Sequence, residues 1–375
     1  MILPGATLGL LGGGQLGRMF TAAARRMGYE VIVLDPDPAS PAGGLATRHL
    51  RAAYTDLAAL TELGRSAAAV TTEFENVPAQ SLAFLRQFCP VRPGPEAVAV
   101  TQDRVAEKSF VRDRGMLTAA FHPVREESDA EPAFAEVGTP ALLKTSRLGY
   151  DGKGQALVDS VAGLREAFAR FGGQPCILER RLPLDLEISV VLARNTEGHL
   201  VTYPVAENHH VNGILDTSLV PARIPDALAQ RAQQAAASIA RALDYVGTLA
   251  VEFFVVGDQL LVNEMAPRPH NSGHYTLDAC VTDQFEQQVR AVAGLPLGDT
   301  TLLSPVVMVN LLGDLWSGGE PRWERALENP RVKLHLYGKR EPRPGRKMGH
   351  LNVLAPAPEE ALAQALAARE RLKSS

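Results

Sequence analysis

Residues 247–274, GTLAVEFFVVGDQLLVNEMAPRPHNSGH, contain two apolar stretches joined by a short turn at residues 256–259. This pattern predicts an antiparallel hairpin in which Glu252 lies opposite Asn263 or Glu264. Two carboxylates that lie this close repel each other strongly unless a cation sits between them. Because Mg²⁺ prefers oxygen ligands and often bridges carboxylates to phosphates, the hairpin predicts a site for magnesium and phosphate.

The hairpin runs directly into a loop with three further polar side chains. Arg268, His270 and Asn271 bring a planar cation, an imidazole and an amide next to the expected metal, and Pro267 and Pro269 keep the loop extended. Such a set of donors suits the binding of a small oxyanion.

A glycine-rich loop, KTSRLGYDGKGQ at residues 144–155, separates two short apolar stretches that we expect to be strands. Its glycines free the backbone to turn its N–H groups towards an anion, and Lys144 and Lys153 add positive charge. The alternative is an ordinary hairpin loop with solvated lysines. Lysine usage favours phosphate binding, because only seven of the 38 basic residues are lysines and five of them lie in the stretches discussed in this section.

The N-terminal stretch predicts a βαβ unit. The strand TLGLL, residues 7–11, runs into GGGQLGRM and a helix, and a second strand ends at Asp35. Glycines 12, 14 and 17 fit a dinucleotide fingerprint, with Asp35 on a ribose hydroxyl, and this leaves a nicotinamide oxidoreductase as one alternative. Gln15 at the helix start suits a small phosphorylated ligand equally well.

A third strand, within AAAVTTEFENVP, ends in polar residues at the edge where a parallel sheet binds its ligands. Glu73, Glu75 and Asn76 are therefore candidates to line a crevice, the alternative being solvated carboxylates at a strand end. The Pro- and Gly-rich stretch VRPGPEAV that follows is a plausible domain boundary.

The middle of the chain adds charged residues at regular spacings. A helix from about residue 101 would carry Arg104 and Lys108 on one face. Two strands then follow, with Glu179 at the end of the first and Glu187 in the second. Alternation in EISVVL predicts that every other residue is buried and that Glu187 shares a face with Ser189, where a carboxylate needs a cation or hydroxyl partner.

Two further basic stretches have simple alternative explanations. The pair His209-His210, in ENHHVNGIL, is typical of surface loop histidines. The basic loop at residues 339–347 lies between two predicted strands, and such a loop is usually only solvated, although Lys339 and Lys347 are two of the seven lysines.

The overall composition limits the classes of function. A chain of 375 residues is long enough for two or three domains. Its net charge of −4 gives no general attraction to nucleic acid, so phosphate binding must be local. Three widely spaced cysteines are expected to be reduced, and no apolar run is long enough for a membrane span. We therefore expect a cytoplasmic protein with small-molecule substrates, without nucleic acid or membrane partners.

Five motifs in this order, GGGQLGRM, TEFENVP, GYDGKGQ, VEFF with NEMAPRPHNSGH, and YGK with GRKMGHLNVL, closely resemble the N5-carboxyaminoimidazole ribonucleotide synthetases of the ATP-grasp superfamily. The resemblance covers nearly the whole chain. It implies an α/β and α+β fold with a Rossmann-like domain at residues 1–98, a two-part ATP-grasp domain at residues 99–297, and a small β-rich domain at residues 298–375.

The resemblance also implies a role for each matching residue. ATP would be held by Arg104, Lys144, Gly149, Tyr150, Asp151, Gly152, Lys153, Gly154, Gln155, Glu179, Arg180, Arg181, Leu182, Glu187, His210, Asn263 and Glu264. Mg²⁺ would lie on Glu252 and Glu264, and bicarbonate on the catalytic residues Arg268, His270 and Asn271. The ribonucleotide substrate would contact Gln15, Glu75, Tyr150, Asp151, Lys153, Lys339, Arg346 and Lys347.

Two departures from the family pattern affect these assignments. The adenine hinge carries Arg180 and Arg181, where an acidic and an aromatic residue are usual. The adjacent His209 and His210 leave the nucleotide contact uncertain by one position.

The implied reaction is the ATP- and bicarbonate-dependent carboxylation of 5-aminoimidazole ribonucleotide through carboxyphosphate, in purine biosynthesis, by a homodimer. Two further alternatives remain beside the oxidoreductase. A formate-using glycinamide ribonucleotide transformylase would share the metal hairpin. A non-catalytic nucleotide-binding protein would have no reason to keep both Glu252 and Glu264.

Overall fold

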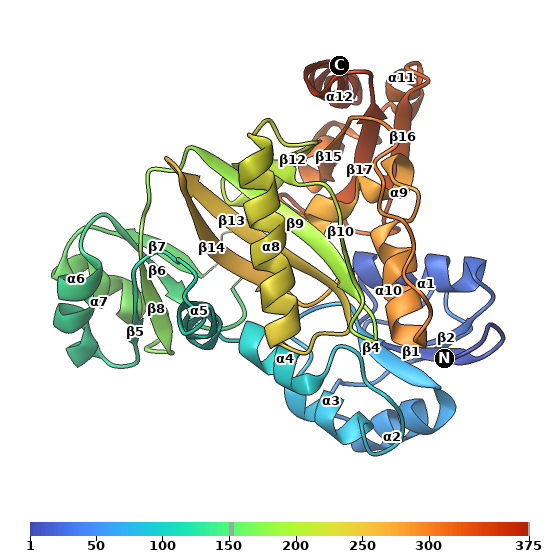
Figure 1. Cartoon of the computed structure of the whole chain (residues 1–375), viewed down its shortest axis with the longest axis horizontal. Helices are drawn as coiled ribbons and strands as arrows, with labels where there is room; N and C mark the ends of the chain where they lie inside the picture. Colours follow the sequence, from blue (N-terminus) through green and yellow to red (C-terminus); the bar gives the residue numbers. More distant parts are fainter. Residues whose placement is uncertain (150–153, 374–375) are drawn as a thin grey trace.

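The computed structural model describes residues 1–149 and 154–373, and over these ranges the strands form three sheets (Figure 1). The N-terminal sheet is parallel, in the order β3-β2-β1-β4, whereas the other two are antiparallel. The predicted combination of a Rossmann-like unit with α+β parts is confirmed. The domain boundaries after residues 98 and 297 remain predictions.

The N-terminal sheet has helices on both faces. Its elements are β1 (Thr7–Leu11), α1 (Gln15–Arg26), β2 (Glu30–Leu34), β3 (Arg48–Leu50), α2 (Leu57–Ser66), β4 (Ala69–Thr72), α3 (Ala79–Leu85) and α4 (Pro95–Thr101). Successive side chains of a strand point to opposite faces, so Leu8 and Leu10 pack with α1 while Leu11 packs with α2 and α3. The strands read as continuous apolar runs because both faces are covered.

A small antiparallel sheet, in the order β5-β8-β6-β7, carries the start and the end of the glycine-rich loop. This part of the chain comprises α5 (Arg104–Arg112), β5 (Phe121–Val124), η1 (Glu127–Asp129), α6 (Ala130–Val137), β6 (Ala141–Thr145), β7 (Gln155–Val158), α7 (Val161–Arg170) and β8 (Cys176–Arg180). The predicted strands on either side of the loop are confirmed as the antiparallel pair β6 and β7. Helices α6 and α7 share the core of this sheet.

The third sheet is the largest and runs through the middle of the molecule in the order β14-β13-β9-β11-β12-β15-β17-β16, with β10 paired to β9. Its strands are β9 (Leu186–Arg194), β10 (Leu200–Thr202), β11 (Ala206–Val211), β12 (Ile214–Val220), β13 (Gly247–Val256), β14 (Gln259–Ala266), β15 (Val306–Leu312), β16 (Val332–Leu336) and β17 (Lys347–Leu354). Because β12 pairs with β15, the C-terminal strands extend the sheet of the central region.

The helices of this second half are α8 (Asp226–Ala242), η2 (Asn271–Gly273), α9 (Thr276–Ala279), α10 (Gln284–Ala293), η3 (Gly313–Gly318), α11 (Trp323–Leu327) and α12 (Pro358–Arg371). Helix α8 lies across β9 and β13, and α12 covers the C-terminal strands (Figure 1). Helix α10 instead lies beside α1 and packs Phe285, Val289 and Val292 into the core of the N-terminal sheet.

One prediction about β9 was wrong. Alternation in EISVVL predicted that every other residue is buried, but residues 188–193 are all buried. The reason is that β9 is an interior strand with both faces covered: Ile188 and Val190 contact the α8 core, while Val191 belongs to a second core. Ser189 lies on the Val191 face and bonds to Ser272, so the prediction that Glu187, Ser189 and Val191 share a face agrees with this arrangement.

The glycine turn after β1 is closed by the chain's own carboxylates. The N–H of Gly13 donates to Asp35 Oδ2 at 2.7 Å, and the N–H groups of Gly14 and Gly17 donate to Glu73 at 2.6 and 2.9 Å. Asp35 is buried, so it does not present a free carboxylate to a ribose. The anion position at the start of α1 is thus filled internally, which argues against the dinucleotide alternative.

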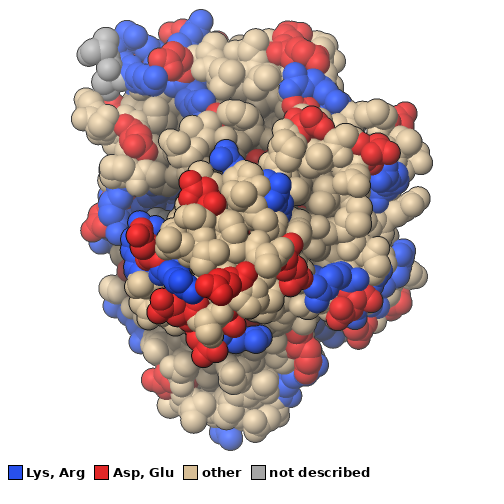
Figure 2. Space-filling view, turned by 90° about the vertical axis from the view of Figure 1, so that its left-hand side faces the viewer, with Lys and Arg blue, Asp and Glu red and all other residues tan. Residues whose placement is uncertain are grey.

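The face shown in Figure 2 carries Lys and Arg side chains interspersed with Asp and Glu side chains. Opposite charges adjoin over this surface, as expected for a chain with a small net charge. Within the described ranges, no helix combines the length and the hydropathy that a membrane crossing requires.

The glycine turn generates a stability prediction. Gly12 has φ +97°, and a Cβ there would overlap Glu73 Cγ, whereas Gly5 has nearly the same φ, +94°, with open space around it. Both Gly→Ala substitutions introduce backbone strain of about 1–3 kcal/mol. Gly12→Ala should lower the free energy of unfolding by a further ~1–3 kcal/mol through overpacking. Urea denaturation followed by circular dichroism measures both losses, and equal losses in the two variants would contradict the packing argument.

Candidate active site

A cavity of about 1720 Å³ lies where the three sheets meet. Each residue that the resemblance implies for the site and that the structure describes lines it: Gln15, Glu75, Arg104, Lys144, Gly149, Gly154, Gln155, Glu179, Arg180, Arg181, Leu182, Glu187, His210, Glu252, Asn263, Glu264, Arg268, His270, Asn271, Lys339, Arg346 and Lys347. Tyr150, Asp151, Gly152 and Lys153 lie outside the described residues. Residues far apart in the sequence therefore converge on one space.

The β13–β14 hairpin has the predicted register. Glu252 lies directly opposite Glu264, and Phe253 lies opposite Val262, so Asn263 is the extra residue of a β-bulge. A bulge changes the direction in which neighbouring side chains point. It accounts for Asn263 and Glu264 both lining the cavity, although adjacent residues of a regular strand face opposite ways.

The two facing carboxylates have unequal surroundings. Burial and the charge of Glu264 raise the pKa of Glu252 to about 7. Burial also acts to raise the pKa of Glu264, but the Arg104 guanidinium, whose Nη1 lies 3.0 Å from Glu264 Oε2, brings it below its usual value. Among the described residues, no three His, Cys, Asp or Glu side chains form a ready-made metal site. Two carboxylates without a third ligand suit Mg²⁺, which is commonly held by one or two carboxylates plus substrate phosphates.

Lys144 is held by a buried charge cluster next to the hairpin. Its Nζ lies 2.9 Å from Glu179 Oε2, and the Nζ of Lys108 lies 3.5 Å from the same oxygen. Burial would raise the pKa of Glu179, but the two lysines lower it to about 2. Lys108 also donates to Asn263 O at 2.9 Å, and so ties α5 to β14. The cluster holds the Lys144 ammonium at the mouth of the glycine-rich loop.

Arg104 joins three elements around the same space. It pairs with Glu264 on β14 and donates from Nη2 to Gly149 O at 3.1 Å, at the start of the glycine-rich loop. In the hinge, the backbone N–H groups of Arg180 and Arg181 donate to Ala120 O and Pro140 O. These two N–H groups are thus already used within the protein, and Oε2 of Glu179 is used by the lysines.

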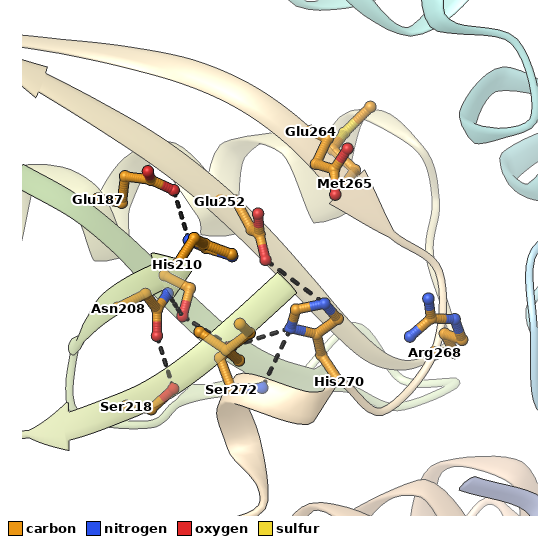
Figure 3. A network of polar contacts seen from close by, with 12 residues as sticks. Glu187, Asn208, His210, Ser218, Glu252, Glu264, Met265, Arg268, His270 and Ser272 are labelled. Atoms are coloured by element: carbon orange, nitrogen blue, oxygen red, sulfur yellow. Dashed lines mark hydrogen bonds and ion pairs between the residues drawn. The ribbon is translucent and has the colours of Figure 1, made fainter. Parts of the chain in front are cut away.

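The structure distinguishes between the two adjacent histidines. Both lie on β11, so the interpretation as loop histidines was wrong, and a bulge separates them. His209 is exposed, whereas His210 lines the cavity with its Nδ1 2.7 Å from Glu187 Oε2 (Figure 3). The bulge places the two side chains differently although they are neighbours in the sequence.

The loop after β14 gathers donors beside Glu252. Arg268 Nε lies 2.5 Å from Glu75 Oε2. His270 Nε2 lies 3.4 Å from Glu252 Oε1 (Figure 3). Burial, followed by the nearby charge of Arg268, brings the pKa of His270 well below its usual value, so the imidazole is neutral. Asn271 is buried, and neither polar atom of its amide has a hydrogen-bond partner in the described structure. An unpaired buried amide facing a cavity is suited to a polar ligand.

At the opposite end, α1 meets the C-terminal basic loop. Lys339 Nζ donates to Gln15 Oε1 and to Lys347 O, and Arg346 Nη1 donates to Glu341 O at 2.9 Å. Gln15 and the three basic side chains line the cavity together. This brings the start of α1 and the start of β17 to one basic end of the cavity.

Sequence reasoning missed several lining residues. Leu142 and Phe254 are apolar, and each stands two positions from a candidate, Lys144 or Glu252, on the same face of its strand. The two-residue period was therefore a signal that could have found them. Glu107, which is buried and accepts a hydrogen bond from Met265 N, lies on a helix and gave no such signal.

Three domain families match successive parts of the chain. Residues 5–102 match the ribonucleotide synthetase preATP-grasp domain, residues 109–285 the ATP-grasp domain, and residues 306–364 the phosphoribosylaminoimidazole carboxylase C-terminal domain. The order agrees with the three parts predicted from the motifs.

Relatives match over nearly the full length. N5-carboxyaminoimidazole ribonucleotide synthase of Bacillus subtilis (strain 168) is 44% identical over 361 residues, which are 96% of this chain and 94% of the relative. The solved ADP complex of purK, an N5-carboxyaminoimidazole ribonucleotide synthetase, has a TM-score of 0.93 at 44% identity and covers 98% of this chain and 97% of its own. The Aspergillus clavatus N5-carboxyaminoimidazole synthase, solved with ADP and 5-aminoimidazole ribonucleotide, has a TM-score of 0.88 at 30% identity and covers 98% and 99%. The chain belongs to the N5-carboxyaminoimidazole ribonucleotide synthetase family.

Proposed function

We propose that this chain uses ATP and bicarbonate to carboxylate the amino group of 5-aminoimidazole ribonucleotide, giving N5-carboxyaminoimidazole ribonucleotide for purine biosynthesis. One observation carries the proposal: a single cavity joins the facing carboxylates Glu252 and Glu264 to a donor set at Arg268–Asn271 and to a basic end at Gln15 and Lys339. A nucleotide, a small oxyanion and a phosphorylated substrate each have a matching region in this one space.

ATP would occupy the space between the small sheet and the β13–β14 hairpin. Leu142 and Phe254 offer apolar surface to a base, while Lys144 and Arg104 offer positive charge to phosphates. Glu252 and Glu264 would hold Mg²⁺, because their oxygens are the ligands that this ion prefers. When bound, Mg²⁺ offsets the negative charge of the phosphates.

Bicarbonate would lie against the loop after β14. Arg268 offers a planar cation, neutral His270 offers an N–H group, and the unpaired amide of Asn271 offers both a donor and an acceptor. Asn271 is buried and Arg268 and His270 are largely shielded from solvent, where hydrogen bonds to an anion are stronger than in water. The ribonucleotide would extend from Glu75 to the basic end, with its phosphate on Lys339, Arg346 and Lys347.

The reaction would proceed in two steps. A bicarbonate oxygen attacks the γ-phosphorus of ATP, the bond to the β-phosphate oxygen breaks, and ADP and carboxyphosphate form. The substrate amine then bonds to the carboxyl carbon, directly or after release of CO₂, and the C–O bond to phosphate breaks. The amine loses a proton, and inorganic phosphate is the final leaving group. The proposed setting is a cytoplasmic homodimer, and sedimentation equilibrium would measure the assembly.

The direct test is a substrate comparison with the purified protein. With Mg²⁺, ATP, bicarbonate and 5-aminoimidazole ribonucleotide, one ADP and one phosphate should form per carboxylated product, measured by a coupled ADP assay and by incorporation of labelled bicarbonate. Formate with glycinamide ribonucleotide should give no product, because the proposed substrates are bicarbonate and 5-aminoimidazole ribonucleotide. Formylation of glycinamide ribonucleotide, without carboxylation, would replace the proposal by the transformylase alternative.

Removal of one hairpin carboxylate tests the metal assignment. Glu252→Gln keeps the volume of the side chain but removes a proposed Mg²⁺ ligand, so kcat/KM for ATP should fall roughly a hundredfold or more, as on loss of an electrostatic group that stabilises developing charge. Asp258→Asn, in the exposed turn of the same hairpin, removes the same charge away from the cavity and should leave the activity unchanged. Mg²⁺ titrations of activity give both results, and an unaltered Mg²⁺ dependence in Glu252→Gln would remove Glu252 from the metal site.

A further inference from the structure

A continuous chain of buried side-chain hydrogen bonds leads from the interior of the large sheet to the ring of His270 (Figure 3). The oxygen of Ser218 lies 2.7 Å from Asn208 Oδ1, and Asn208 Nδ2 lies 2.9 Å from Ser189 Oγ. Ser189 Oγ lies 2.8 Å from Ser272 Oγ, which lies 2.9 Å from His270 Nδ1. We name this set the Ser218–His270 relay.

The direction of every bond in the relay follows from one backbone group. The N–H of Ser272 points at His270 Nδ1, at 3.3 Å, and a backbone N–H can only donate. Nδ1 is therefore an acceptor and carries no proton. The Ser272 hydroxyl, 2.9 Å from the same nitrogen, must then donate to it as well, since two facing lone pairs would repel.

The directions of the remaining hydrogen bonds then follow one after another, because each hydroxyl has one proton to donate. The proton of Ser272 is used on His270, so Ser189 donates to Ser272. The proton of Ser189 is then used, so Asn208 presents its NH₂ group to Ser189 and its carbonyl oxygen to Ser218. The orientation of the Asn208 amide thus follows from the network and need not be assumed.

The relay lies outside the cavity. Ser189, Asn208, Ser218 and Ser272 are all buried, and they do not line the cavity that holds His270. They come from β9, β11, β12 and η2, the elements beneath the histidine. A buried chain of polar side chains is costly unless every donor and acceptor in it has a partner. Here that condition is met only when all the hydrogen bonds run from Ser218 towards His270.

The backbone of His270 is fixed independently. Gln284, which is fully buried on α10, accepts from the N–H of His270 at 2.9 Å and donates from Nε2 to His270 O at 2.8 Å. The two hydrogen bonds of Gln284 fix the backbone of His270, while the relay fixes its imidazole ring. Together they leave Nε2 as the ring nitrogen outside the relay, with Glu252 Oε1 at 3.4 Å.

We propose that Ser189, Asn208 and Ser218 are positioning residues for the reaction, and that they act together with the N–H of Ser272 to hold His270 as the tautomer with its proton on Nε2. Nε2 would then donate a hydrogen bond to an oxygen of bicarbonate without transferring the proton. The other tautomer would present a lone pair to the anion and repel it. This inference rests on the proposed function, since it assigns a mode of action to a residue proposed to hold bicarbonate.

Asn208→Asp is the sharpest test, because the side chain keeps its shape but its carboxylate only accepts. Ser189 and Ser218 would both donate to it, Ser189 would accept from Ser272, and the chain would reverse until the proton lies on His270 Nδ1. We expect kcat to fall by about tenfold to a hundredfold, the usual effect of removing a group that orients a functional histidine. KM for bicarbonate should rise, while KM for ATP stays unchanged.

The tautomer is read directly and without substrates. Two-bond ¹H–¹⁵N correlation spectra of protein labelled at histidine distinguish the Nε2–H form from the Nδ1–H form, and comparison with His270→Ala assigns the signal. The native protein should show the Nε2–H form and Asn208→Asp the Nδ1–H form. An Nδ1–H signal in the native protein, or an unchanged tautomer and kcat in folded Asn208→Asp, would overturn the proposal.

Two further variants keep the test decisive. Ser218→Ala removes a single hydroxyl, frees the Asn208 amide to turn over, and should give a mixture of tautomers with a smaller fall in kcat. An unchanged tautomer and kcat in Ser218→Ala would overturn the proposal even if Asn208→Asp fails to fold.

The matched control is Ser81→Ala. Ser81 is a buried serine of α3 away from the cavity, so this variant should leave both the tautomer and kcat unchanged. If the native protein makes no carboxylated product, the proposed function fails, while the spectra still decide the tautomer.

Discussion

The repulsion between Glu252 and Glu264 is the constraint around which the site is built. They lie opposite each other on one hairpin, and the strand register keeps their backbones side by side. Neighbouring side chains offset the repulsion at both carboxylates. Arg104 pairs with Glu264, while His210 and His270 lie near Glu252, and together these contacts reach from α5 through the hairpin to β11 and the loop after β14.

The large sheet makes this arrangement possible, because it is continuous from the hairpin to the C-terminal strands. Residues that hold opposite ends of the cavity are therefore parts of one hydrogen-bonded framework. The N-terminal sheet closes the third side through Glu75 and Gln15. The three parts of the chain thus enclose a site that none of them contains alone.

Sequence reasoning succeeded where a local pattern determines the structure. The register of Glu252 against Glu264 follows from strand spacing and a short turn, and the strands on either side of the glycine-rich loop follow from apolar runs. It failed where the packing of distant elements determines the burial of a residue or the direction of its side chain. Burial of both faces of β9 depends on what packs against them, and the different exposure of His209 and His210 depends on a bulge that no single residue encodes. The cap on α1 by Glu73 joins residues 56 and 59 positions apart, so no local window contains it.

The packing of α10 against the N-terminal sheet has a consequence for how the molecule is made. Phe285, Val289 and Val292 complete a core that begins with Leu8 and Leu10, and Ile2 N donates to Ala293 O at 2.7 Å. During synthesis, which proceeds from the N-terminus, the first sheet therefore stays partly bare until residues 284–293 have left the ribosome. A fragment that ended at residue 98 would expose that apolar face to water and to other chains. The boundary that the motifs suggest thus divides the sequence, whereas the hydrophobic core of the N-terminal sheet is built from two separate segments.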